Sequence, residues 1–92
     1  MESVKELIKT LENIEKDNNI KSVEDVLSND IVLVEKAVCL ADHVLINDKG
    51  SINYNALEEI EEAGFDVIPL EMDNWGWIVG GIQTSKGIIV FG

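Results

Sequence analysis

The sequence predicts a small α+β domain, in which N-terminal helices are followed by a short strand, a further helix and a C-terminal three-stranded antiparallel meander. Residues 3–16 repeat apolar residues at helical spacing, and residues 65–91 form apolar runs separated by short turns. The chain has 92 residues, of which 46% are hydrophobic, and this is the size and composition of one globular domain spanning 1–92.

The first predicted helix covers residues 3–16. Ser3 and Glu6 have the spacing of a capping box, whose side chains satisfy free N–H groups at a helix start. Asp17-Asn18-Asn19 predicts the end of the helix, because these side chains bond to local backbone and favour turns. The apolar residues between these signals form one stripe: Val4, Leu7, Ile8, Leu11 and Ile14.

Residues after this helix combine helix and strand signals. A capping pattern at Ser22 predicts a short helix of one or two turns. The β-branched residues that follow permit strands at 31–34 and 43–46, but the apolar residues also keep a helical period. We predict a helix over 30–41, apolar on most sides and therefore buried, and a strand over 43–47.

A turn and one more helix precede the meander. Asp48-Lys49-Gly50-Ser51 predicts the turn. Asn55 and Glu58 resemble a second capping box, and Gly64 is well placed to end the helix with a positive φ. The apolar stripe of this helix is narrow and consists of Ala56, Leu57, Ile60 and Ala63.

The meander follows from short connections, which make neighbouring strands antiparallel. Its strands are predicted at 65–72, 75–83 and 88–91. Pro69 cannot donate a ladder hydrogen bond, so it predicts that the first strand lies at an edge or contains a bulge. The glycines in the middle strand indicate a close approach of another segment, for which we expect a helix.

Both faces of this sheet are predicted to be apolar, because strand side chains alternate. Each predicted strand has apolar residues on both sides: Trp75, Trp77 and Val79 oppose Ile78 and Ile82, Ile68, Leu70 and Met72 oppose Phe65 and Val67, and Ile88 and Val90 oppose Ile89 and Phe91. A two-layer domain needs only one apolar face. Either the helices cover both faces in a closed three-layer monomer, or another molecule covers the second face.

The formal net charge is −11, from 18 acidic and 7 basic residues. Residues 51–74 contain no base and seven acids, namely Glu58, Glu59, Glu61, Glu62, Asp66, Glu71 and Asp73. Such a cluster either keeps the protein in solution or steers a cationic partner towards it. The acidity argues against nucleic acid or an anionic membrane as a direct partner.

No motif names a reaction or a cofactor. Cys39 and His43 alone cannot build a zinc site, and a single cysteine cannot form an intramolecular disulfide. We expect Cys39 to be a small buried hydrophobe and His43 to lie at a helix end. No apolar run reaches the length of a membrane helix and no signal-peptide pattern begins the chain, so we expect a cytoplasmic protein.

The expected function is protein binding without catalysis. In composition alone the chain is similar to immunity proteins and phage-encoded inhibitors, which implies a basic partner such as a nuclease. The expected partner-binding residues are Glu58, Glu59, Glu61, Glu62, Asp66 and Asp73, with Trp75 or Trp77 as an apolar anchor. The alternatives are a self-associating domain that forms a homodimer through the second sheet face, and a small enzyme.

Overall fold

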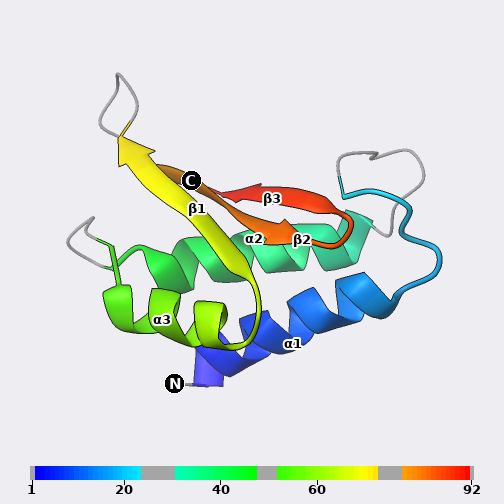
Figure 1. Cartoon of the computed structure of the whole chain (residues 1–92), viewed down its shortest axis with the longest axis horizontal. Coiled ribbons are helices and arrows are strands. Elements are labelled where there is room, and N and C mark those ends of the chain that lie inside the picture. Colours follow the sequence, from blue (N-terminus) through cyan, green and yellow to red (C-terminus); the bar gives the residue numbers. More distant parts are fainter. Residues whose placement is uncertain (1, 24–30, 48–51, 73–77, 92) are drawn as a thin grey trace.

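The computed structural model describes residues 2–23, 31–47, 52–72 and 78–91 (Figure 1). Three helices precede three strands, which form one antiparallel sheet in the order β1-β2-β3. The helices are α1 (Glu2–Lys16), α2 (Ile31–Leu45) and α3 (Tyr54–Glu62), and the strands are β1 (Asp66–Met72), β2 (Ile78–Thr84) and β3 (Gly87–Phe91). This order confirms the predicted α+β class and the C-terminal meander.

Helix α1 has the predicted apolar stripe. Val4, Leu7, Leu11 and Ile14 are fully buried. The helix begins at Glu2, so Ser3 already lies in its first turn and the predicted capping box at Ser3 is wrong. Its end is as predicted: the helix stops at Lys16, and the N–H of Asn19 donates to Asp17 Oδ1 at 2.8 Å, which forms a local turn.

Helix α2 continues to Leu45, so the predicted strand over 43–47 is wrong. Ala41, Val44 and Leu45 are buried on one helical face, and this packing overrides the β-propensity of the segment. Of the expected strand, only an isolated bridge between Ile46 and Ile52 is present. The predicted turn at 48–51 and most of the short helix predicted to start at Ser22 lie outside the described residues.

Helix α3 is capped at both ends by local signals. Its N-cap is Asn53, which is extended (φ −86°, ψ 92°) and accepts from the N–H of Ala56 at 3.3 Å, so the capping box predicted at Asn55 is wrong. Gly64 has the predicted positive φ, +100°. Its N–H donates to Glu61 O at 3.0 Å and the next N–H, of Phe65, donates to Ile60 O at 3.3 Å, which together form a Schellman motif.

The helices cover one face of the sheet, giving two layers (Figure 1). On the inner face, Ile82 and Ile89 are buried and lie in register with half-buried Val67. On the opposite face, Ile68 is 38% exposed and Val90 is 61% exposed. Within the described part of the sheet, the closed three-layer arrangement is therefore wrong, and the second apolar face is open.

Strand β1 has both features that Pro69 predicts. It lies at an edge of the sheet, and its register with β2 shifts between Ile68 and Glu71. The irregularity brackets the proline, where a regular ladder would need an N–H that proline lacks.

The β2–β3 turn is hydrogen-bonded to the end of α1. The N–H of Ser85 donates to Glu15 Oε2 at 2.8 Å, and Lys86 Nζ donates to the carbonyl of Asp17. The carbonyl of Lys86 in turn accepts from the N–H of Val23 at 3.0 Å. The Lys86 ammonium therefore lies at the negative end of the α1 dipole. It links the β2–β3 turn, near the C-terminus, to the end of the N-terminal helix.

Neighbouring atoms on the open face leave too little space for a side chain at Gly81 of β2. A Cβ there would lie 2.8 Å from Ile88 Cγ2 and 3.4 Å from the carbonyl oxygen of Ile89. The close approach predicted from the glycines thus comes at Gly81 from adjacent strand residues and not from a helix. We expect Gly81→Ala to lower the free energy of unfolding by about 1–3 kcal/mol, measured by urea denaturation.

A double-mutant cycle identifies the contact responsible. Ile88→Ala removes the Cγ2 atom, so Gly81→Ala should cost clearly less in that background than in the wild type. Strictly additive losses would show that Ile88 does not restrict position 81.

Candidate functional site

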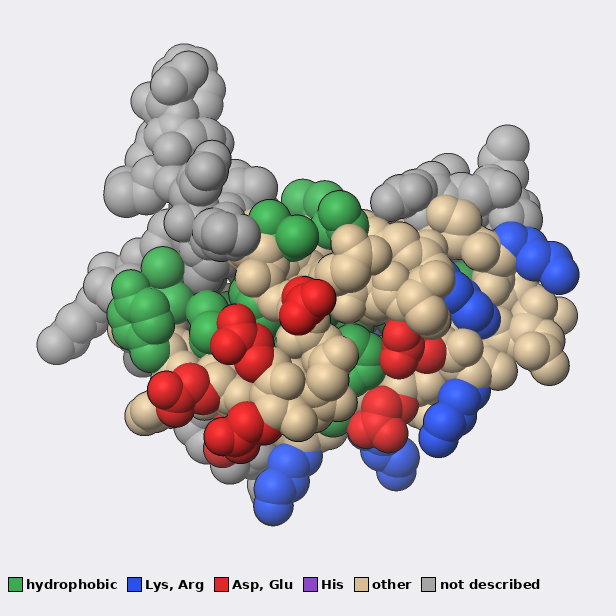
Figure 2. All heavy atoms as spheres, in the orientation of Figure 1, with side chains coloured by type: hydrophobic (Ala, Val, Ile, Leu, Met, Phe, Trp, Pro, Cys, Tyr) green, Lys and Arg blue, Asp and Glu red, His purple; other side chains and the backbone are tan. Residues whose placement is uncertain are grey.

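Four glutamates extend from α3 into solvent. Glu58, Glu59, Glu61 and Glu62 are all exposed, whereas Ala56 and Ile60 of the same helix are fully buried. Figure 2 shows acidic side chains without lysines over α3 and the start of β1, whereas along α1 acidic side chains and lysines are mixed. With exposed Asp66, these residues are called here the acidic surface: Glu58, Glu59, Glu61, Glu62 and Asp66.

The connection between α3 and β1 brings the helix and strand parts of the acidic surface together. The Schellman motif at Gly64 reverses the chain within a few residues after Glu62, and β1 begins at Asp66. Of the eight predicted binding residues, five therefore lie on one continuous surface. The other three, Asp73, Trp75 and Trp77, lie outside the described residues.

The charge on α3 is unfavourable for the helix itself. Glu58 and Glu62 are four residues apart, and like charges at this spacing destabilise a helix by about 0.2–0.5 kcal/mol per pair. Glu61 and Glu62 also lie in the last turn, where the helix dipole favours cations, and that turn contains no base.

No cation within the described ranges compensates these carboxylates. Glu6 of α1 shows the contrast, because its carboxylate pairs with Lys36 of α2 at 3.2 Å. No described lysine lies within ion-pair distance of the four α3 glutamates. The acidic surface is therefore available to positive groups from outside the molecule.

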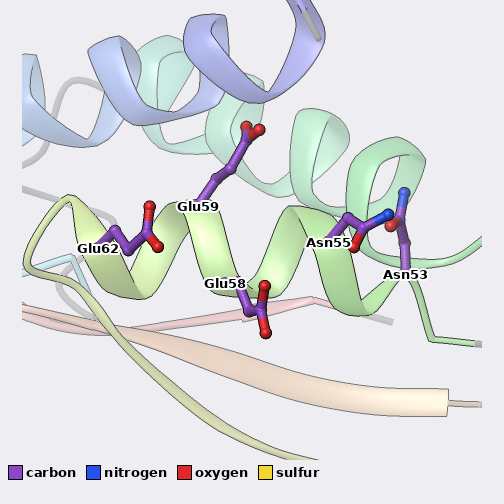
Figure 3. Close-up of a pocket in the computed structure, with 5 residues that line it drawn as sticks. All are labelled: Asn53, Asn55, Glu58, Glu59 and Glu62. Atoms are coloured by element: carbon purple, nitrogen blue, oxygen red, sulfur yellow. The ribbon is translucent and has the colours of Figure 1, made fainter.

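An open hollow of about 500 Å³ lies along α3. Its lining residues are Asn53, Asn55, Glu58, Glu59 and Glu62 (Figure 3). In this view Glu59 extends towards α1 and α2, Glu58 extends towards the strands, and the two asparagines lie at the helix start. The hollow offers carboxylate and amide oxygens, which suit a guanidinium or ammonium group.

Tyr54 is an exposed aromatic residue that the sequence analysis missed. It is 67% exposed and opens α3. Because it lies four residues before Glu58, and Glu58 four before Glu62, the three side chains follow one another along the helix surface. The available signal was this four-residue spacing, which Tyr54 continues towards the N-terminus.

Cys39 and His43 lie on α2 and do not line the hollow on α3. Cys39 is exposed, so its prediction as a buried residue is wrong: it falls on the solvent stripe of α2 with Val32 and Glu35. His43 is exposed in the last turn of the helix, as predicted. Among the described residues, no three His, Cys, Asp or Glu side chains are grouped so that they could hold a metal ion.

No described helix combines the length and the apolar character needed to cross a membrane. The chain matches no protein-family model, no curated protein and no solved structure.

Proposed function

We propose that the protein is a non-enzymatic binding protein of the inhibitor or immunity type, whose acidic surface binds a protein with a basic surface. One observation carries the proposal: α3 presents four carboxylates that no described cation compensates, in positions that weaken the helix. Natural sequences break local stability rules chiefly at functional sites. The exposed thiol of Cys39 fits a reducing compartment, so we also propose a cytoplasmic location.

Electrostatics would serve such binding in two ways. A single-sign surface on a protein of net charge −11 raises the association rate of a cationic partner. The same charges would select against acidic partners, since juxtaposed like charges cost several kcal/mol. Because exposed charges are screened over about 10 Å at 0.1 M salt, the complex should weaken as salt is added.

Tyr54 supplies an aromatic anchor beside these charges. Tyrosine and arginine are enriched among residues that dominate binding energies, and a guanidinium stacks on an aromatic ring. An arginine of the partner could therefore lie on the Tyr54 ring and reach Glu58, the next side chain along the helix.

The test is affinity capture followed by a binding measurement. The immobilised protein is used to capture proteins from its native cells, and captured proteins are identified by mass spectrometry. Each is then purified and titrated by calorimetry. We expect a basic protein whose affinity falls at least about tenfold in the double variant Glu58→Gln, Glu62→Gln.

A matched control separates local from total charge. Glu12→Gln with Glu35→Gln removes the same two charges from exposed positions on α1 and α2. This control should bind nearly as well as wild type. Equal loss in both double variants, or captured proteins indifferent to both, would rule out α3 as the binding element.

A further inference from the structure

The open face of the sheet is apolar at its centre. Register places Ile68, Gly81 and Val90 side by side in one row, and Asp66, Gln83 and Ile88 in the next. The half-buried side chain of Ile88 and the exposed side chain of Ile68 lie beside Gly81, where a Cβ would be 2.8 Å from Ile88 Cγ2 and 3.5 Å from Ile68 Cγ1. Ile68, Ile88 and Val90 are called here the open apolar face.

The open apolar face is continuous with the acidic surface. Asp66 and Ile68 are two residues apart on the same strand and both are exposed, so they lie on one face. Two residues of a strand span about 7 Å. The backbone positions of Asp66 and Ile68 are therefore about 7 Å apart, and Val90 lies in the row of Ile68, across Gly81.

Area and charge argue against a second copy of the chain as the occupant. The sheet has three strands about 4.8 Å apart, and a seven-residue strand is about 23 Å long, so one face of the sheet has an area of only about 300 Å². A stable interface needs about 800 Å² from each partner. Two copies would also bring together net charges of −11 each.

We propose that the open apolar face and the acidic surface form one docking surface for a segment of a basic protein. The segment places an apolar side chain against Ile68 and Val90, and a lysine or arginine about 7 Å away on Asp66. This inference rests on the proposed function and adds that the partner segment is both apolar and cationic. An occupant of this kind would bury the open apolar face and neutralise Asp66 together.

Two peptides of equal charge test the inference. In an extended chain, alternate residues share a face, so Lys-Ser-Ile-Ser-Lys-Ser-Val-Ser-Lys presents lysines and apolar residues together at the required spacing. The control, Lys-Ser-Ser-Ser-Lys-Ser-Thr-Ser-Lys, keeps the charges alone. We expect the first peptide to bind at least about fivefold more tightly by NMR titration at low salt.

Two isosteric variants locate the apolar contact. Val90→Thr should abolish the preference for the first peptide, whereas Val32→Thr, at a valine 71% exposed on α2, should preserve it. Asp66→Asn should weaken both peptides.

Each other outcome overturns the inference in a distinguishable way. Equal affinity for both peptides would mean binding by charge alone, which leaves the proposed function standing. Self-association seen by light scattering and removed by Val90→Thr would identify a second copy as the occupant. Failure of both peptides to bind at millimolar concentration would also reject the inference, while the capture experiment still decides the proposed function separately.

Discussion

Replacing Phe91 with Ala is expected to lower the free energy of unfolding by about 3–5 kcal/mol. Phe91 is 2% exposed, has the largest side chain among the most deeply buried residues, and lies on the inner face of β3. Its partner across the strands is Gly80, which has no side chain that could move into the space. Since domains of this kind are stable by only about 5–15 kcal/mol, urea denaturation followed by circular dichroism should show a large loss.

The adjacent residue is the control for this experiment. Val90 lies on the same strand but on the open face, where it is 61% exposed. Val90→Ala should cost less than about 1 kcal/mol, because its side chain gains little from burial in the isolated protein. Similar losses for the two variants would contradict the two-layer arrangement, since they would place both faces of β3 in a core.

Elements specified by local signals could be predicted from the sequence. The stripe of α1 and its end at Asp17 depend on neighbouring residues alone, and both are confirmed. The same holds for Gly64, whose positive φ closes α3, and for Pro69, which marks the edge and the irregularity in β1. In each case one side chain, or the absence of one, restricts the backbone directly.

Elements decided by packing between distant segments could not be predicted. Helix α2 continues to Leu45 because Val44 and Leu45 are buried against other segments of the core. The local sequence does not specify those segments. Whether helices cover one sheet face or two depends on how three helices pack, which alternation in the strands does not determine. The cap at Asn53 was missed because Asn55, two residues later, offers the same chemistry.

The candidate site likewise has one part that the sequence predicts and another that depends on the fold. Clustering of the acids on α3 is visible in the sequence, because a single helix presents them. Their lack of described ion-pair partners is a property of the folded surface, since Glu6 on the charge-mixed helix α1 is paired only because the fold places Lys36 of α2 beside it. Continuity of Asp66 with Ile68 and Val90 requires the strand register.

Replacing Glu58, Glu59, Glu61 and Glu62 together with Gln is expected to stabilise the fold and to abolish partner binding. The substitutions remove three like-charge pairs at helical spacings of three or four and two unfavourable charges at the helix C-terminus. The free energy of unfolding should rise by about 1–2 kcal/mol, and the melting temperature by about 5–10 °C. Thermal unfolding at low salt measures this directly.

Opposite signs for stability and binding distinguish a functional surface from a solubilising one. The variant still carries a net charge of −7, four negative charges fewer than −11, so its solubility should change little. Raising the salt concentration should shrink the stability gain, because screening weakens the same repulsions in the wild type. If the variant were instead less stable than wild type at every salt concentration, the glutamates would have stabilising contacts within the chain, and the reason for assigning them to a partner would disappear.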